Sequence, residues 1–190
     1  MSGQGADDGG SSGRDASRPG RPSRRERPPA PAYQRALGLL VRREHSATEL
    51  KRKLRGKGVE SDELDAALET LQRQGFQDDR RYAEALVRSR ALAGHGPVRI
   101  RAELRQNGVP AADVDAAFEA AEAGGVDWDA TAARVAARFL PALRAAARGA
   151  EGIKQRHKAV SFLLRRGFTQ DQARQALALR HDASDAFPDD

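Results

Sequence analysis

The sequence predicts an all-α fold of three tandem three-helix repeats that form an elongated array, straight or curved. The first observation is an internal repeat: Gly58-Val59 recurs fifty residues later as Gly108-Val109, and a degenerate third copy, Gly167-Phe168, follows fifty-nine residues after that. Self-similarity at such periods is typical of stacked supersecondary units that present an extended binding surface. The second observation is a composition rich in Ala, Arg and Leu with only 5% aromatic residues, which favours helices over sheets.

The composition divides the chain into three repeats and two flanking tails. The N-terminal tail consists mainly of Gly, Ser, Pro, Asp and Arg, has almost nothing to bury, and is therefore predicted to be disordered. Because each repeat alone is too small to build much of a core, neighbouring repeats must pack against one another. The predicted parts are a Gly/Pro/Arg-rich tail at 1–32, three-helix repeats at 33–75, 76–124 and 125–180, and an acidic flexible tail at 181–190.

In the first repeat, the helical period of apolar residues starts at Tyr33 and predicts a helix that ends near Glu44-His45. The segment from Ser46 to Glu49 has the form of a capping box, in which the Ser hydroxyl and the Glu carboxylate each satisfy a backbone N–H. Glycines at 58 and 75 end the second and third helices. The expected inner residues are Tyr33, Leu37, Leu40 and Val41, then Leu50 and Leu54, then Leu64, Ala67, Leu68 and Leu71.

The second repeat follows the same scheme. Asp78 or Asp79 can cap its first helix, and Gly94-His95-Gly96 breaks that helix. Pro97 suits the first turn of the next helix, where its missing N–H costs nothing, and Pro110 starts the third. The expected inner residues of the first two helices are Tyr82, Ala83, Leu86 and Val87, then Val98 or Ile100, and Leu104.

The third repeat is expected to open with a long helix that Asp127 caps and Pro141 kinks. A second helix should run over Ile153–Arg166. A capping box from Thr169 to Gln172 should open the last helix, at Asp171–Arg180, and this gives nine helices and no strand in all. The expected inner residues of the long helix are Trp128, Ala132, Val135, Phe139 and Leu140.

No motif in the sequence indicates catalysis, a cofactor or a metal. The Asp78-Asp79 pair stands where a helix N-terminus needs an acceptor, so capping explains it better than a carboxylate pair. The sequence has no Gly-x-Ser-x-Gly, no Walker loop and no His-Glu-x-x-His. The histidines lack partners at metal-ligand spacing and are expected on the surface; they are His45, His95, His157 and His181. We therefore predict a protein that is not an enzyme.

The residue usage also predicts the compartment. The absence of cysteine excludes disulfides and thiolate metal sites. No apolar run approaches the length of a membrane span, and the N-terminus has no hydrophobic signal core. These features predict a soluble cytoplasmic protein with no membrane partner, and nothing in the repeat pattern requires more than a monomer.

Positive charge is the remaining signal for function. Residues 33–180 hold 27 basic and 19 acidic side chains, a surplus that suits polyanions or acidic protein surfaces. The second helix of every repeat is enriched in Lys and Arg, which an ordinary solvated face would not require. Arg101 and Arg105 lie one turn apart and should act together, whereas Arg99 points about 200° away from Arg101. The predicted partner- or DNA-binding residues are Arg88, Arg90, Arg99, Arg101, Arg105, Lys51, Lys53, Lys154, Lys158 and Arg165.

Four segments resemble the RecX family of regulatory proteins. The segment REHSATELKRKL, residues 43–54, is similar to the first module of that family. The segments GFQDDRRYA, residues 75–83, and GHGPVRIRAEL, residues 94–104, carry its specific central motif. The segment KAVSFLLRRGF, residues 158–168, is similar to the close of the third module. The resemblance covers about Ala36 to Leu177; it departs from the family at Asn107, where a basic residue is common, and the Arg/Pro tail has no counterpart.

This resemblance implies both a fold and a function. The family fold is three tandem three-helix repeats, and the family activity is negative modulation of the RecA recombinase. Such proteins lie in the helical groove of the RecA–DNA filament, where they block extension or strand exchange and lower ATP hydrolysis and coprotease activity. The resemblance thus implies RecA as protein partner, with DNA contacted alone or within the filament, and a role in regulating DNA repair, recombination and the SOS response.

Two other readings of the residues stay open. A stand-alone basic helical DNA-binding protein would also have this charge and these helices. A steep dependence of bare-DNA affinity on salt, with an affinity equal to that for the filament, would favour this reading. A repeat scaffold for some other acidic protein is the third.

Overall fold

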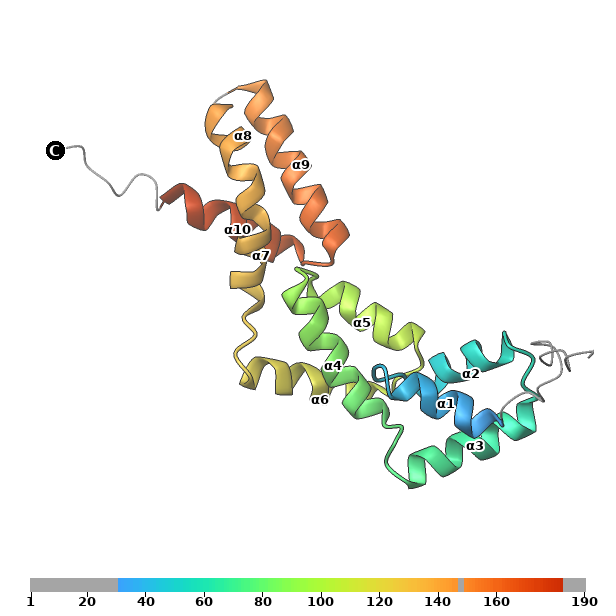
Figure 1. Cartoon of the computed structure of the whole chain (residues 1–190). Helices are drawn as coiled ribbons and strands as arrows, with labels where there is room; N and C mark the ends of the chain where they lie inside the picture. Colours follow the sequence, from blue (N-terminus) through green and yellow to red (C-terminus); the bar gives the residue numbers. More distant parts are fainter. Residues whose placement is uncertain (1–30, 147–148, 183–190) are drawn as a thin grey trace, which may run out of the picture. The chain divides into compact units, whose positions relative to one another are not determined.

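The chain is all-α over the residues that the computed structural model describes, which are 31–146 and 149–182, with the backbone alone for 179–182. Within these ranges there are ten α-helices, one short 3-10 helix and no strand (Figure 1). The predicted fold class is therefore confirmed. The predicted tails at 1–32 and 181–190 lie outside the described residues, apart from their inner edges.

The first three helices share one apolar core. They are α1 (Ala32–Leu40), α2 (Ala47–Arg55) and α3 (Ser61–Arg73). The core contains Leu50, Leu54, Leu64 and Leu71, as predicted from the helical period. Helix α1 ends earlier than predicted and buries Ala32 and Ala36; Tyr33, Leu37 and Leu40 pack only partly against the core, and Val41, expected inside, is 80% exposed.

The next three helices enclose a second core. They are α4 (Asp79–Leu92), α5 (Pro97–Gln106) and α6 (Ala111–Ala123). Asp78 caps α4 by accepting from the backbone N–H groups of Arg80 and Arg81, and Pro97 occupies the first turn of α5. Between the two alternatives for the inner face of α5, Ile100 is buried and Val98 is 52% exposed.

The third set of helices differs from the prediction at its beginning. The expected long helix is divided into α7 (Trp128–Ala136), a 3-10 turn η1 (Ala137–Phe139) and α8 (Leu140–Ala145). Asp127 caps α7 as predicted, and Pro141 lies in the first turn of α8, directly after the break. The α7 residues buried in the core are Ala132 and Ala136; Val135 and Phe139 pack only partly against it.

The remaining helices of this set are α9 (Ala150–Arg166) and α10 (Gln170–Asp182). The predicted capping box before α10 is complete. The Thr169 hydroxyl accepts from the Gln172 N–H at 3.1 Å, and the Gln172 side chain accepts from the Thr169 N–H at 3.0 Å. None of the helices described here is both long and apolar enough to cross a membrane.

Helices α5 and α9, which correspond to the predicted second helices of the second and third repeats, meet end to end. The N–H groups of Gly96 and Val98, at the start of α5, donate to the carbonyls of Arg166 and Gly167, at the end of α9, at 2.8 and 3.0 Å. Free N–H groups at one helix start thus satisfy free carbonyls at another helix end. Only glycines permit this approach, because a Cβ on Gly96 would lie 2.3 Å from the Gly167 backbone and one on Gly167 would lie 2.3 Å from the Arg99 Cβ.

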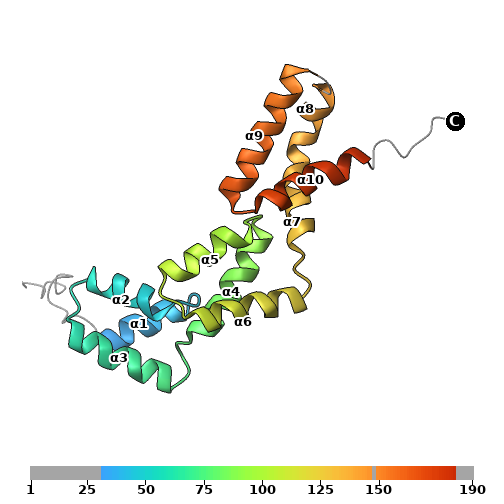
Figure 2. The same ribbon diagram turned by 180° about the vertical axis from the view of Figure 1, so that it is seen from behind.

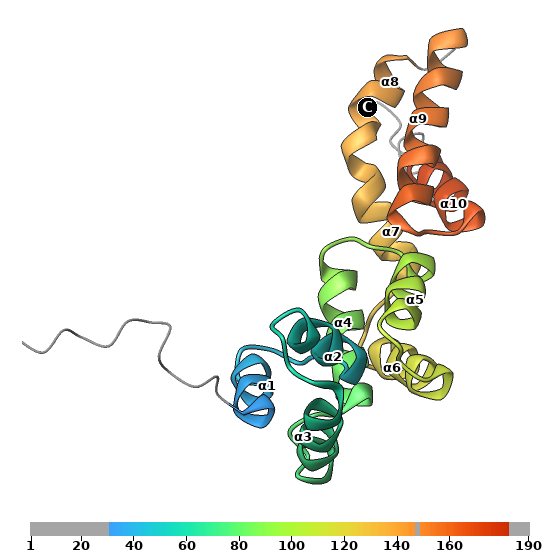
Figure 3. The same cartoon turned by 90° about the vertical axis from the view of Figure 1, so that its right-hand side faces the viewer.

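A similar junction joins α5 to α2. The Ser46 hydroxyl, at the N-cap of α2, accepts from the Glu49 N–H and donates to the carbonyl of Asn107, the C-cap residue of α5, at 2.8 Å. The next N–H, that of Ala47, donates to the Asp79 carboxylate at 2.9 Å. The three basic second helices therefore follow one another in the order α9, α5, α2, each end contacting the next start (Figure 2, Figure 3).

Candidate functional site

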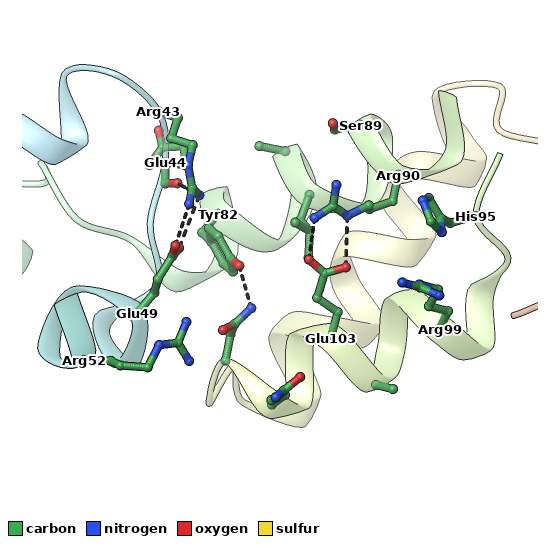
Figure 4. A pocket seen from close by; sticks show the side chains of 15 residues that line it. Arg43, Glu44, Glu49, Arg52, Tyr82, Ser89, Arg90, His95, Arg99 and Glu103 are labelled. Carbon is green, nitrogen blue, oxygen red and sulfur yellow. Dashed lines mark hydrogen bonds and ion pairs between the residues drawn. The ribbon is translucent and has the colours of Figure 1, made fainter. Parts of the chain in front are cut away.

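A hollow of about 1050 Å³ lies where α4 and α5 face the link between α1 and α2 and the helix α2 itself (Figure 4). Helices α4 and α5 form two of its walls, and the segment from Arg43 to Arg52 forms the third. We call this space the α4–α5 hollow. Its lining residues are Arg43, Glu44, Glu49, Arg52, Tyr82, Ala85, Leu86, Ser89, Arg90, His95, Arg99, Ala102, Glu103, Gln106 and Asn107.

The three carboxylates of the hollow are already held by arginines of the chain. Arg90 holds Glu103 in a two-point pair, with Nε–Oε2 at 2.9 Å and Nη2–Oε1 at 2.6 Å. Arg81 pairs with Glu44, and Arg43 pairs with Glu49. The hydrogen bond from Arg90 holds the pKa of Glu103 below its usual range, so this carboxylate stays charged near neutral pH.

Glu49 is the centre of a buried ionic cluster. Its carboxylate contacts Arg43, the His45 Nδ1 at 2.8 Å and the Lys53 Nζ at 3.2 Å. Burial alone would raise the pKa of Glu49, but the close contacts with these three neighbours outweigh it and lower the pKa to about 2. The predicted reciprocal capping by Glu49 is therefore wrong: Ser46 caps α2, while the glutamate is used in this cluster.

His45 was expected on the surface and is instead 2% exposed. Burial lowers its pKa more than the nearby Glu49 raises it. The His45 Nδ1 lies 2.8 Å from the Glu49 carboxylate but does not have the geometry of a hydrogen bond, so the contact is a close electrostatic approach. Sequence spacing did not reveal this burial, since His45 lies in the link between α1 and α2 rather than on a helix face.

Asn107 connects the floor of the hollow to the first repeat. Its side-chain amide donates to the Tyr82 hydroxyl at 2.9 Å, while its backbone carbonyl accepts from Ser46. Burial raises the pKa of the Tyr82 hydroxyl, and the charges of Glu49 and Glu103 act in the same direction. Asn107, where this sequence departs from the RecX family, thus makes structural contacts at the place where the first and second repeats meet.

Two arginines of the hollow remain available. Among the residues that the structure describes, no carboxylate lies within ion-pair distance of Arg52 or Arg99. Arg99 makes only a long bond, 3.4 Å, to the backbone carbonyl of Arg165. Beside Arg99, burial and the charges of Arg99 and Arg166 lower the pKa of His95. The hollow therefore offers two uncompensated cations and a neutral histidine to an incoming anion.

The predicted binding residues are divided by their contacts. Arg90 and Arg99 line the hollow, but Arg101 faces α6, where it pairs with Asp115 and stacks 4.1 Å over the Phe118 ring. Lys51 and Lys53 are also paired within the chain, with Asp65 at 2.7 Å and Glu49 at 3.2 Å.

The remaining predicted residues lie outside the hollow and are more open. Arg88 and Lys154 make loose pairs, both at 3.8 Å, with glutamates on their own helices. Arg105, Lys158 and Arg165 are exposed, and no described carboxylate lies within 4.0 Å of them. Three residues that line the hollow were not among the predicted binding residues: Arg43, Arg52 and His95. Of these, only Arg52 could have been found from the sequence, because it lies on a predicted second helix rich in Lys and Arg.

Comparison with family models gives three successive matches. The RecX first three-helix domain matches residues 32–79, the second matches 78–117 and the third matches 128–177. These matches cover more than half of the chain and follow the order of the three helical sets described above.

Individual relatives and solved structures give the same result. "Regulatory protein RecX" of Stenotrophomonas maltophilia strain K279a is 44% identical over 162 residues, which cover 85% of this chain and 93% of that protein. The protein of the same name from Xanthomonas axonopodis pv. citri strain 306 is 42% identical over 161 residues, 80% of this chain and 88% of that one. A crystal structure of regulatory protein RecX superposes with a TM-score of 0.63 at 25% identity, covering 77% of this chain and 71% of that one. The RecX structure from Lactobacillus salivarius gives a TM-score of 0.61 at 20% identity, covering 77% and 92%.

Proposed function

Because the chain belongs to the RecX family of regulatory proteins, we propose that it binds the groove of the RecA–DNA filament and lowers the recombinase, ATPase and coprotease activities of RecA. The observation that carries this proposal is the match of all three RecX domains in tandem. A protein in this role acts in the cytoplasm as a monomer, regulates DNA repair and recombination, and needs no catalytic residue.

The series of second helices supports this proposal. Helices α9, α5 and α2 contact one another end to end, so their exposed cations belong to one packed series. Arg105, Lys158 and Arg165 lie on this series without a described acid partner, and each charge-assisted contact with a partner would contribute about 1.5–3 kcal/mol. A protein that contacts successive RecA protomers in this way would resist the filament's changes of shape.

The test is RecA ATP hydrolysis on single-stranded DNA, measured with and without the full chain. We expect inhibition that increases with protein concentration and weakens with added salt, because salt screens exposed charges. Unchanged hydrolysis at equimolar protein would contradict the proposal.

The alternative is a stand-alone DNA-binding protein, and the basic surplus of residues 33–180 is the observation in its favour. In that case the affinity for bare DNA would match the affinity for the filament and fall steeply with salt. Measuring both affinities at the same ionic strength separates the two functions.

A further inference from the structure

The α4–α5 hollow combines free positive charge with a few apolar lining residues. Arg52, from α2, and Arg99, from α5, lie on opposite sides of it (Figure 4). The lining residues Ala85 and Leu86 of α4 and Ala102 of α5 supply apolar surface, and the two alanines leave room for another chain to approach closely.

From this combination we propose that the hollow is the docking site for an acidic amphipathic segment of a protein partner. Carboxylates of that segment would pair with Arg52 and Arg99, and its apolar side chains would cover Ala85, Leu86 and Ala102. The inference deepens the proposed function, since in that setting RecA supplies the segment and the hollow is where protein, rather than DNA, is held.

The acids of the hollow favour a protein segment over a nucleic acid. Glu44, Glu49 and Glu103 all line it, and although each is paired within the chain, their charges remain. A DNA strand carries a charge on every phosphate and would bring some of them close to these glutamates. A protein segment can place a carboxylate opposite each free arginine and neutral residues elsewhere.

The aromatic content of the hollow leads to the same choice. Tyr82 is the aromatic residue among its lining, it is buried, and its hydroxyl is engaged by Asn107, so it offers no platform on which bases could stack. The exposed cations Arg105, Lys158 and Arg165 lie outside the hollow and remain available for phosphates.

The experiment titrates the full chain with two probes and follows NMR signals of Ser89, His95 and Gln106, which line the hollow. One probe is a helical peptide of Glu, Leu and Ala, and the other is an oligothymidylate of similar length. We expect the peptide to shift these signals and the oligonucleotide to shift signals elsewhere. Hollow signals that respond more strongly to the oligonucleotide, or that do not respond to the peptide, would overturn the proposal.

Matched double variants test whether peptide binding depends on Arg52 and Arg99. Replacing Arg52 and Arg99 by Ala should weaken peptide binding by about tenfold or more, which corresponds to about 1.4 kcal/mol. Replacing Arg73 and Arg156 by Ala removes the same charge from exposed positions outside the hollow and should leave peptide affinity within about twofold, since distant surface charges are largely screened. Equal losses of peptide affinity in the two variants would show that binding depends on net charge alone, and would overturn the proposed docking site.

The peptide test does not depend on RecA. If the hollow binds the peptide through Arg52 and Arg99 while the chain leaves RecA hydrolysis unchanged, the docking site stands and the proposed function fails. If the chain inhibits RecA while the hollow does not bind the peptide, the proposed function stands and the docking site fails.

Discussion

At the scale of single residues, the core leucines give the clearest prediction. Leu104 is fully buried in the core of the second repeat, so Leu104→Ala removes apolar contacts and leaves a cavity. The variant should lower the free energy of unfolding by about 2–5 kcal/mol, measured by urea denaturation. The control is Leu92→Ala, because Leu92 is 80% exposed. A smaller loss at Leu104 than at Leu92 would contradict the assigned core.

The Glu49 cluster predicts an acid-sensitive stability. The folded pKa of about 2 lies below the ordinary value of 4.5, so the contribution of Glu49 is complete above about pH 5 and is lost as the pH falls towards 2. A shift of this size corresponds to about 3 kcal/mol. The lowered pKa of His45 has the same sign, and its contribution starts to disappear below pH 6.5.

The variant Glu49→Gln tests this account, because it removes the titrating group while keeping its shape. It should be less stable than the wild type at pH 7 and should lose less stability between pH 5 and pH 2. Thermal unfolding followed by circular dichroism across that range provides the measurement. Parallel pH profiles for the two proteins would show that Glu49 is not the titrating group.

At the scale of helices, the junction between α9 and α5 depends on the absence of a side chain. In Gly96→Ala the new Cβ would lie 2.3 Å from the Gly167 backbone, so the two helix ends must separate. We expect faster hydrogen exchange at the amides of residues 96 and 98, which donate across the junction, together with a lower melting temperature.

Gly38→Ala is the matched control for this substitution. Gly38 lies on α1, and nothing comes within 4 Å of a Cβ placed there. Because Ala favours a helix over Gly by about 1 kcal/mol, this variant should be at least as stable as the wild type. Unchanged exchange at Val98 in Gly96→Ala would mean that the junction does not hold α5 in place.

The same elements show how far the sequence could predict the fold. Capping residues and glycines located the helices because they act through local backbone chemistry, as Asp78 and Thr169 do. The helical period of apolar residues predicted the inner face of α1 wrongly, since Ala36 rather than Val41 is buried. Packing against α3, and not side-chain size, selects that face. The break at Ala137–Phe139 was expected only as a kink at Pro141.

The candidate site was harder to predict than the fold. Helical geometry separates Arg99 from Arg101, and the structure does place them on different sides of α5, one lining the hollow and the other against α6. The sequence alone does not say which side is open, because this depends on where Asp115 and Phe118 lie. The contribution of Arg43 to the hollow likewise depends on contacts between repeats.

At the scale of the whole molecule, the proposals lead to a comparison of two arginine pairs. Arg52 and Arg99 are free of described acids and face the hollow, whereas Arg101 must leave Asp115 and the Phe118 ring before it can bind a partner. Changing Arg52 and Arg99 to Ala should therefore weaken RecA inhibition more than changing Arg101 and Arg105 to Ala. For the first pair we expect the concentration that half-inhibits ATP hydrolysis to rise by more than about tenfold.

The fold control for this comparison is the unfolding transition of each double variant. Loss of the Arg101 contacts should lower stability by about 1 kcal/mol, because the pair with Asp115 is half-exposed, whereas the Arg52/Arg99 variant should keep the wild-type melting temperature. The Arg52/Arg99 variant should thus lose mainly RecA inhibition, and the Arg101/Arg105 variant mainly stability. If the Arg101/Arg105 variant remains folded and loses the larger part of its inhibition, the partner surface lies on the α6 side of α5, and the hollow is not where RecA binds.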